Sequence, residues 1–206
     1  INEYCNPCEA IRDGHMMEVP ALEELEAFSL DGIAYEAFNT SGGLGTLCET
    51  LAGKVENLNY KTVRYPGHRD IVKMLVRDLR LSHSRGVLKD VFEAAIPMTT
   101  QDVVLVFVTV TGWKGGRLMQ ETFVRKVYAS RVNGRVLSAI QLTTAAGICA
   151  MVDLHREGRL PRAGFVRQEQ ASLEDFLANR FGRHYAGDSQ PHTESLHHDA
   201  PARHAA

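Results

Sequence analysis

An arginine, a tyrosine and a histidine lie close together in the segment Arg64-Tyr-Pro-Gly-His68. A guanidinium forms paired hydrogen bonds with a carboxylate, and an imidazole or a phenol can take up or release a proton. The Pro-Gly pair ends a strand and a helix follows, so these side chains emerge near unpaired helix N–H groups. The segment predicts a site that holds a carboxylate and moves a proton. The alternative is a structural turn in which Arg64 pairs with a carboxylate of the protein and Tyr65 caps the core.

A glycine-rich loop, Thr40-Ser-Gly-Gly-Leu-Gly45, follows a predicted strand and precedes a predicted helix. Backbone N–H groups in such a position bind anions, as they do in dinucleotide-binding folds. The loop departs from the dinucleotide fingerprint, because Cys48 stands where the third glycine would be and no acidic residue about twenty positions on could hold a ribose. Three interpretations remain open: a structural turn, a site for an anion or a substrate carboxylate, and a cofactor cradle.

The cysteines and histidines do not form a metal-binding pattern. Cys5-x-x-Cys8 resembles half of a zinc site or a redox pair, but the chain has no second such pair, and Cys48 and Cys149 fall in helical patterns. Four of the nine histidines lie between residues 192 and 204, in a polar segment without predicted structure. We therefore predict unliganded thiols and no metal site.

Apolar periodicity, turn dipeptides and helix caps predict the elements that position these residues. Strands are predicted over 9–20, as a hairpin around Asp13-Gly14, and over 32–39, 55–65, 103–111 and 120–130. Helices are predicted to end at Leu51 and to span 71–79, 85–95, 138–157 and 172–180, the last two beginning at the caps Ser138 and Ser172.

This mixed order of strands and helices predicts an α+β fold, with a mixed, largely antiparallel sheet and helices packed on one face. The β-branched run over 103–111 predicts a central strand that is covered on both faces. The helix over 138–157 is apolar around most of its circumference. Its Ala145-Ala-Gly147 segment indicates either core packing or close contact with another domain or a second subunit.

Composition places the chain among ordinary globular proteins. Of its 206 residues 44% are hydrophobic and 23% are charged, and the formal net charge is -2. That charge predicts no general attraction to nucleic acid or to an anionic membrane. Four cysteines do not suggest a disulfide framework, and the sequence has no signal peptide or apolar run of membrane-spanning length, so we expect a cytoplasmic protein.

The chain divides by composition near its C-terminus. Residues 1–186 are expected to form one domain, whereas residues 187–206 contain one leucine and no aromatic residue, which predicts a disordered tail. Because the chain begins Ile-Asn-Glu without an initiator methionine, we expect it to be part of a longer polypeptide.

Several of these segments together resemble the C-terminal part of the saccharopine dehydrogenase family, in particular its lysine 6-dehydrogenase-like members. The Thr-Ser-Gly-Gly and Arg-Tyr-Pro-Gly-His motifs, in this order and at this separation, are typical of the group. The matching segments are 1–8, 11–14 with 19–22, 37–46, 61–68 and 147–160, so that the resemblance covers roughly residues 1–180.

The resemblance implies a two-part enzyme, the substrate domain of a Rossmann-type dehydrogenase joined to an N-terminal Rossmann domain that binds NAD or NADP. The implied reaction is hydride transfer at a carbon that bears nitrogen, in lysine, saccharopine or a carboxylated polyamine. The chain contains no complete GxGxxG motif. We therefore expect the Rossmann half and most of the cofactor site to lie outside this chain, and the chain alone to be inactive.

Within this interpretation the glycine-rich loop and the turn before His68 must converge on one pocket that holds an amino-acid substrate. The candidate residues are Arg64, Thr40, Ser41 and Gly42 for the substrate carboxylate, Tyr65 and His68 for the proton, and Asn39, Glu3 and Asn6 for the amine end.

Two other functions fit the same sequence. A dimerisation module would use the hairpin over 103–130 and the helix around Ala145 as its interface, and a homodimer is expected whether or not the chain also binds substrate. A small-ligand-binding protein without catalysis would show no cofactor-linked reaction with any amine.

Overall fold

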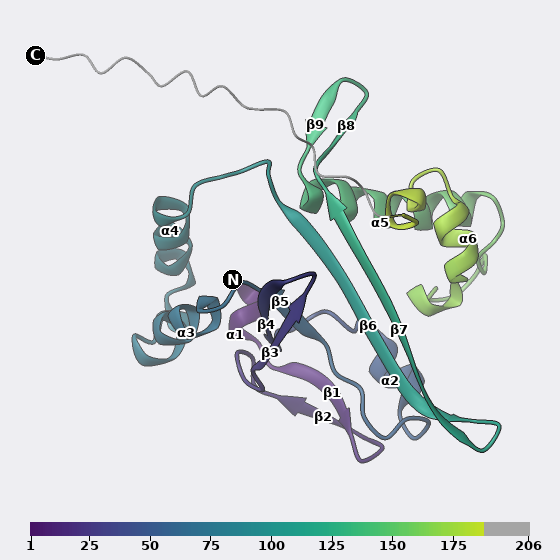
Figure 1. The fold of residues 1–206 in the computed structure, drawn as a ribbon, viewed down its shortest axis with the longest axis horizontal. Coiled ribbons are helices and arrows are strands. Elements are labelled where there is room, and N and C mark those ends of the chain that lie inside the picture. The colour runs from purple at the N-terminus through teal and green to yellow at the C-terminus, as the bar shows by residue number, and fades with distance from the viewer. Residues whose placement is uncertain (188–206) are drawn as a thin grey trace, which may run out of the picture. The chain divides into compact units, whose positions relative to one another are not determined.

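The computed structural model describes residues 1–187 and divides the chain into two compact units (Figure 1). Unit 1 comprises Ile1–Met98 and Leu160–Ser172, and unit 2 comprises Thr99–Arg159 and the described residues from Leu173 onwards. The sequence predicted a single domain over 1–186. Apart from Gly187, the tail predicted over 187–206 lies outside the described residues.

The described residues of unit 1 form short helices and two groups of strands, the hairpin β1-β2 and the three-stranded sheet β3-β4-β5. Its elements are α1 (Asn2–Cys5), β1 (Cys8–Arg12), β2 (His15–Val19), β3 (Glu26–Leu30), β4 (Ile33–Asn39), α2 (Leu47–Leu51), β5 (Lys61–Arg64), α3 (His68–Lys73), the π-helical turn η1 (Met74–Asp78), η2 (Leu81–His83), α4 (Arg85–Ala95) and η3 (Gln168–Gln170).

Two Asp-Gly dipeptides make the hairpins of unit 1. Asp13-Gly14 joins β1 to β2 and Asp31-Gly32 joins β3 to β4, and all four residues have positive φ, between 49° and 79°. Such angles form the tight turn that matches the twist of paired strands. The first hairpin confirms the prediction. Strand β3 was not predicted, because Glu23, Glu24 and Glu26, at and just before its start, obscure the apolar alternation and Gly32 was taken as the start of a strand.

The three-stranded sheet β3-β4-β5 carries the predicted site residues, and its register decides which of them share a face. In β4 and β5 Glu36 pairs with Arg64 and Asn39 pairs with Lys61. Directly paired residues of antiparallel strands project to the same face, and successive residues of one strand project to opposite faces. Arg64 therefore lies on the face of Glu36 and Phe38, and Asn39 lies on the other face.

The core of unit 1 forms on the face that carries Phe38. Helices α1, α3 with η1, and α4 contribute Tyr4, Val72, Val76 and Leu88 to this cluster, and Phe38 itself is fully buried. Burying such apolar side chains contributes about 1.5–3 kcal/mol each. Helix α4 has the predicted bounds, and α3 begins at His68, directly after the Pro66-Gly67 pair that was predicted to precede a helix.

The strand predicted over 55–65 is shorter in the structure. Only Lys61–Arg64 pairs with β4, and Leu58 forms an isolated bridge with Ile11 instead. That bridge belongs to a second, smaller apolar cluster around Ile11, Leu44 and Cys48. The glycine-rich loop is therefore attached to the β1-β2 hairpin through α2.

Unit 2 contains two hairpins and two helices. Its elements are β6 (Val103–Lys114), β7 (Arg117–Tyr128), β8 (Ser130–Val132), β9 (Arg135–Leu137), α5 (Ala139–Arg156), α6 (Leu173–Ala178) and η4 (Gly182–Tyr185).

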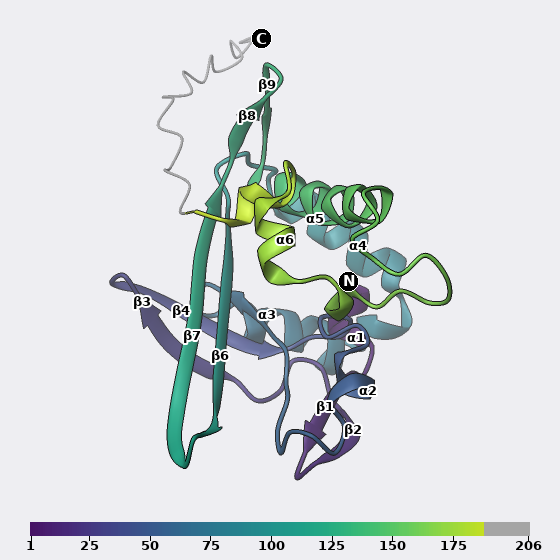
Figure 2. The same cartoon turned by 90° about the vertical axis from the view of Figure 1, so that its right-hand side faces the viewer.

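Strands β6 and β7 form a long two-stranded hairpin that extends well beyond the helices of its own unit (Figures 1 and 2). The sequence predicted a central strand covered on both faces, and this prediction was wrong. From Phe107 to Lys114 every residue of β6 is exposed, because β7 is the single strand paired with it in the described chain. A β-branched run indicates a strand, but it does not say how many neighbours the strand has.

Helix α5 confirms the predicted cap. Ser138 and Gln141 form a capping box, and the helix ends at Arg156, before Gly158. The Asp102 carboxylate accepts hydrogen bonds from the backbone N–H groups of Ala139 (2.6 Å) and Ile140 (3.0 Å), so a negative charge also meets the positive end of the helix dipole.

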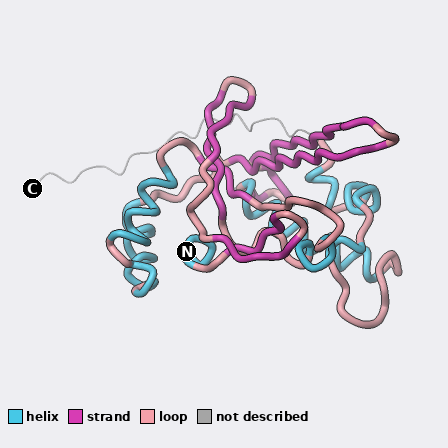
Figure 3. The backbone as a smooth tube through the Cα atoms, turned by 90° about the horizontal axis from the view of Figure 1, so that it is seen from below, coloured by secondary structure: helices cyan, strands magenta, loops and turns pink. Residues whose placement is uncertain are grey.

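The described residues form an α+β fold, as predicted, but the strands do not make one sheet. They make four separate antiparallel sheets, one of three strands and three of two strands (Figure 3). The short turns explain this arrangement, because each one pairs two strands that are neighbours in the sequence. Among the described strands, only β5 returns over a longer connection to pair with an earlier strand, β4. Among the helices of residues 1–187, none has the length and apolar character to cross a membrane.

Candidate functional site

The phenol of Tyr4 lies between Arg64 and His68. Its Oη atom is 3.1 Å from Nε2 of His68 and 3.4 Å from Nη2 of Arg64, and the tyrosine is 7% exposed. A guanidinium can only donate, so the phenol oxygen accepts from Arg64, and with the Nδ1–H tautomer of His68 the phenol proton is directed at Nε2. The three side chains make a line of donors and acceptors that runs from Arg64 through Tyr4 to His68.

Three elements of unit 1 bring these residues together. Arg64 ends β5, His68 begins α3, and Tyr4 comes from α1 at the start of the chain. The buried Phe38 ring packs against both aromatic partners, with centroid distances of 6.2 Å to His68 and 6.4 Å to Tyr4. Packing on a fully buried side chain restricts the rotamers of both rings, so the line is held by the core of the unit.

The surroundings of His68 favour its neutral form. Burial lowers the pKa of the imidazole below its usual value, and the positive charge of Arg64 lowers it further, whereas Glu36 acts in the opposite direction. A neutral imidazole has one unprotonated ring nitrogen. At neutral pH, Nε2 of His68 is therefore suited to accept the Tyr4 proton.

Glu36 caps the helix that carries His68. Its carboxylate accepts hydrogen bonds from the backbone N–H groups of Gly67 (2.9 Å) and Arg69 (2.6 Å), and the residue is 6% exposed. The sequence predicted that these N–H groups would be open to a substrate. The prediction was wrong, because β4 delivers a carboxylate of the protein to the same place.

Tyr65 and Asn39 lie on the opposite face of the sheet from His68. The Tyr65 ring stacks on Tyr35, with centroids 5.7 Å apart and planes 19° apart, and Tyr65 is 60% exposed. Asn39 is 1% exposed, and neither polar atom of its amide has a hydrogen-bond partner in the described chain. Successive residues of a strand project to opposite faces, so Asn39 lies on the face opposite Phe38. Asn39 and Tyr65 are therefore both separated from the line of Arg64, Tyr4 and His68.

The glycine-rich loop and the Arg64 turn lie at opposite ends of the β4-β5 pairing. Thr40 follows Asn39, which pairs with Lys61, whereas Arg64 pairs with Glu36, so the two positions are roughly 13 Å apart along the strands. The two segments therefore do not meet directly along the strands, and the shared pocket stays a prediction. The hydroxyl groups of Thr40 and Thr62 instead bond to each other at 2.6 Å, within the sheet.

Helix α1 contacts both of these places. The Ser41 N–H donates to the Glu3 carbonyl oxygen at 3.0 Å, one residue before Tyr4, while Gly42 is exposed. Asn6, which was also predicted to bind the substrate, has a partner within the protein. Its side-chain oxygen accepts a hydrogen bond from Arg85 of α4 at 2.8 Å. Glu3 contacts the loop through its backbone and its side chain is exposed, so its role at the amine end stays a prediction.

Side chains of unit 1 fill the space around the glycines of the loop. A Cβ atom on Gly43 would lie 2.1 Å from the Tyr60 ring, and one on Gly45 would lie 2.9 Å from Nε2 of Gln168. The Gln168 amide also donates to the Leu44 carbonyl oxygen at 3.2 Å. The glycines are needed for this packing, which supports the interpretation as a structural turn.

A carboxylate of the protein lies beside the same loop. Glu169 accepts hydrogen bonds from the hydroxyl groups of Thr46, at 2.9 Å, and Thr50, and the Thr50 bond is the main cause that lowers the pKa of this carboxyl group. Arg167 donates to Thr50 at 3.0 Å and completes the cluster. The negative charge of Glu169 beside Thr46, at the start of α2, disfavours a phosphate group at this helix end.

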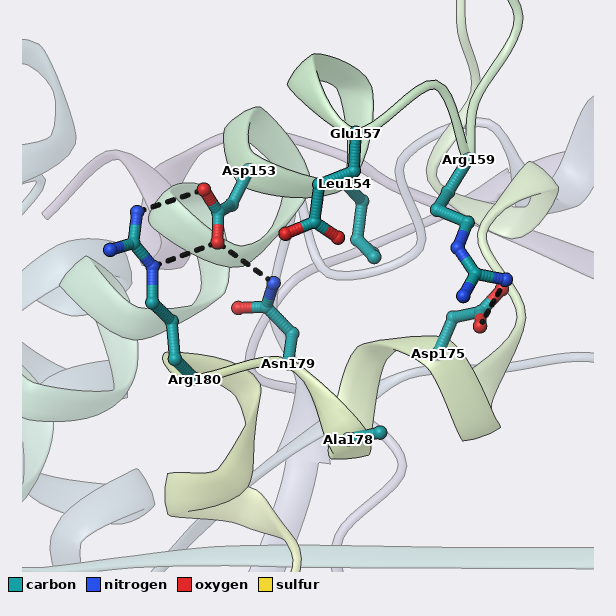
Figure 4. A pocket seen from close by; sticks show the side chains of 8 residues that line it. All are labelled: Asp153, Leu154, Glu157, Arg159, Asp175, Ala178, Asn179 and Arg180. Carbon is teal, nitrogen blue, oxygen red and sulfur yellow. Dashed lines mark hydrogen bonds and ion pairs between the residues drawn. The ribbon is translucent and has the colours of Figure 1, made fainter.

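A polar pocket of about 230 Å³ lies in unit 2, between α5 and α6 (Figure 4). At its edge the Asp153 carboxylate accepts two bonds of 2.9 Å from Arg180 and one of 3.1 Å from Asn179, and it pairs with Arg156 at 2.9 Å. These bonds lower the Asp153 pKa, the Arg180 bond most strongly. Because Asp153 is saturated with donors, we interpret it as the anchor that joins α6 to α5.

No protein-family model matches the sequence. All four cysteines are free thiols, and among residues 1–187 no group of three His, Cys, Asp or Glu side chains is placed to hold a metal ion. Sequence reasoning missed Tyr4 and Glu36. Tyr4 lies between two residues that were chosen, Glu3 and Asn6, and the Asp31-Gly32 turn would have placed Glu36 on a paired strand.

Proposed function

We propose that this chain is the substrate-binding part of an NAD(P)-dependent oxidoreductase that acts on the CH–NH bond of an amino acid of the lysine or saccharopine type. The proposal begins from the sequence resemblance. Its support in the structure is the line from Arg64 through Tyr4 to His68, which combines a donor for carboxylates with a path for one proton. Cofactor binding is assigned to another part of the polypeptide, because Tyr60 and Gln168 pack on glycines of the loop and Glu169 lies beside Thr46.

Arg64 is the proposed anchor of the substrate carboxylate. A guanidinium has five N–H donors, and the bonds that Arg64 makes in the described chain go to the Val63 carbonyl oxygen and to Tyr4. Among residues 1–187 the structure gives Arg64 no ion pair with a carboxylate, although Glu36 is its neighbour across the strands. A half-buried arginine with donors to spare suits a carboxylate ligand.

Tyr4 and His68 are the proposed path of the proton. When a substrate amine loses its proton, the Tyr4 oxygen accepts it while the phenol gives its own proton to Nε2 of His68. One O–H bond breaks as another forms, and the imidazolium then returns its proton to solvent. Burial and Arg64 both disfavour the imidazolium, so the proton is not retained on His68. This assignment replaces Tyr65, whose ring lies on the other face of the sheet.

The carboxylate anchor is tested in the full-length enzyme by an Arg64→Ala substitution. Loss of a charged hydrogen bond costs about 1.5–3 kcal/mol, so we expect KM for lysine or saccharopine to rise roughly 10- to 100-fold. Cadaverine, which lacks the carboxylate, should be oxidised with unchanged kcat/KM relative to the unsubstituted enzyme. Arg77→Ala, an exposed arginine of the adjacent helix, is the matched control. An unchanged KM for the amino acid would exclude the anchoring role.

The proton path is tested by comparing Tyr4→Phe with Tyr65→Phe. Each substitution removes one hydroxyl and keeps the ring. We expect Tyr4→Phe to lower kcat by 10²- to 10⁴-fold, to change the pH profile and to leave KM nearly constant, because general acid-base catalysis contributes about that much. Tyr65→Phe should behave like the unsubstituted enzyme. The reverse result would assign the proton to Tyr65.

A second function, dimerisation, is favoured by the exposed apolar side chains of unit 2. Ile148 and Val152 of α5 are 67% and 65% exposed, and Trp113 at the hairpin tip is 75% exposed. Exposed apolar surface of this extent marks interaction sites. We propose that unit 2 joins two copies of the chain, in a cytoplasmic setting that would keep its thiols reduced.

A chain that binds amino acids without any cofactor-linked reaction in the full-length protein would instead be a small-ligand-binding protein.

A further inference from the structure

We propose that two copies of this chain pair along the outer edge of β7, antiparallel to each other, about a twofold axis at Phe123. The inference deepens the dimerisation proposed above and rests on it. A two-stranded hairpin is marginally stable alone, and its open edge is a template for another strand. Yet the β6-β7 hairpin has twelve residues in each strand, and it leaves Val110, Trp113 and Leu118 more than 60% exposed.

The turn of the hairpin decides which residues face the open edge. Gly115 and Gly116 both have positive φ, 59° and 77°, and Lys114 pairs with Arg117 on either side of them. In such a two-residue turn the flanking pair exchanges both backbone hydrogen bonds, and hydrogen-bonded pairs then alternate along the strands. The odd-numbered residues of β7 therefore direct their N–H and C=O groups to β6, and the even-numbered residues direct theirs outward.

This alternation restricts how the edge can pair with itself. Outward residues must face outward residues, so the twofold axis passes through one residue and not between two. With the axis at Phe123, Thr122 of one copy pairs with Val124 of the second copy through backbone hydrogen bonds. Glu121 of each copy then faces Arg125 of the other, which gives two opposite-charge pairs on one face.

Charge distinguishes this register from its neighbours. An axis at Glu121, Arg125 or Lys126 places like charges opposite each other, which is destabilising. An axis at Met119 also opposes charges, Arg117 with Glu121, but it pairs five residues only, because Gly116 ends the strand. The remaining axes, at Leu118, Gln120, Thr122, Val124 and Val127, face no opposite charges.

Arg125 independently has one guanidinium nitrogen that lacks an acceptor among residues 1–187. Its guanidinium lies 4.4 Å from the Phe123 ring centroid and donates to the Val124 carbonyl oxygen at 2.6 Å, but its Nε atom is buried without a partner in the described chain. The Glu121 side chain is 72% exposed and has a distant partner, Lys114, at 3.8 Å. Pairing at Phe123 brings this available carboxylate to the arginine that needs one.

Sedimentation equilibrium of the 206-residue chain tests the register through charge reversal. Exposed ion pairs contribute about 0.2–1 kcal/mol each, and a reversal replaces two attractions by two repulsions. We therefore expect Glu121→Arg and Arg125→Glu each to weaken the dimer about tenfold, and the double substitution to restore it to within about threefold. Glu93→Arg, an exposed reversal in unit 1, should have no effect. A monomeric chain, or reversals that are without effect or not restored by the double substitution, would overturn the proposal.

Cysteine cross-linking is a second test of the register, and its result does not depend on the affinity of the dimer. At the axis the two Phe123 positions form a non-hydrogen-bonded pair with Cα atoms about 4.5 Å apart, within the range of a disulfide. In a Cys149→Ser background, Phe123→Cys should therefore cross-link on oxidation. Met119→Cys and Val108→Cys should not cross-link. Cross-linking of Met119→Cys in place of Phe123→Cys would assign the contact to the hairpin tip, and cross-linking of Val108→Cys would assign it to β6. Because no substrate is used, the outcome is independent of the Arg64 and Tyr4 tests.

Discussion

Replacing Glu36 by glutamine should destabilise unit 1 far more than an isosteric change usually does. The carboxylate accepts two backbone N–H groups at the start of α3, at 2.9 and 2.6 Å, and it is 6% exposed. Glutamine has one oxygen for these two donors, and its NH₂ group would face the other. One charged hydrogen bond is lost, at about 1.5–3 kcal/mol, together with a favourable charge at the helix start, at about 0.3–1 kcal/mol. We expect the free energy of unfolding to fall by about 2–4 kcal/mol.

The same substitution should change the titration of His68. Glu36 raises the pKa of the imidazole, against the lowering by burial and by Arg64. Without the carboxylate charge the pKa of His68 should fall further. The chemical shift of the His68 ring protons, followed against pH by NMR, measures this direction separately from stability.

Urea unfolding followed by hydrogen exchange at the α3 amides is the assay. Hydrogen exchange reports the stability of unit 1 separately from that of unit 2, whereas a single spectroscopic signal would average the unfolding of the two units. Glu26→Gln is the matched control, because that glutamate lies on the neighbouring strand β3, pairs with Lys61 and is 64% exposed. The control should lose less than about 1 kcal/mol. Equal losses in the two variants would refute the argument that the buried carboxylate caps the helix.

Three further predictions concern other parts of the chain. His68 binds its proton less readily in the folded chain than in the unfolded chain, so stability should decrease as the pH falls below about 6.5, and His68→Gln should flatten this part of a urea-midpoint profile. Gly43→Ala should cost about 1–3 kcal/mol because the added Cβ meets the Tyr60 ring, and adding Tyr60→Ser should recover most of the loss in thermal unfolding. The hydrogen bond from Arg180 lowers the pKa of Asp153, so this carboxylate contributes stability above about pH 4 that is lost as acid protonates it. Asp153→Asn should remove that part of the acid transition measured by circular dichroism, and an unchanged transition would contradict its anchoring role.

The local elements of the fold were accessible from the sequence, because their causes lie within a few residues. The Asp13-Gly14 turn needs positive φ at adjacent positions, and Ser138 with Gln141 satisfies the N–H groups of its own helix start. Arg64 and His68 were also identified as candidates from residue type and spacing. Strand β3 was missed for a local reason too, since the glutamates at and just before its start hide the alternation.

The composition of the candidate site could not be read from the sequence in the same way. Tyr4 joins Arg64 and His68 from sixty residues away, and the Glu36 cap depends on which strand lies beside β5. The spacing of Arg64 and Tyr65 says that they are neighbours, but the pairing of β5 with β4 sends them to opposite faces.

By itself the sequence determined the turns, the helix caps and the residue types available for chemistry, because each of these depends on backbone angles and hydrogen bonds between near neighbours. The tertiary structure alone decided which of those residues meet. The register of β4 with β5 sets the face of every side chain, a shift of one residue would reverse it, and only contacts distant in the chain select that register.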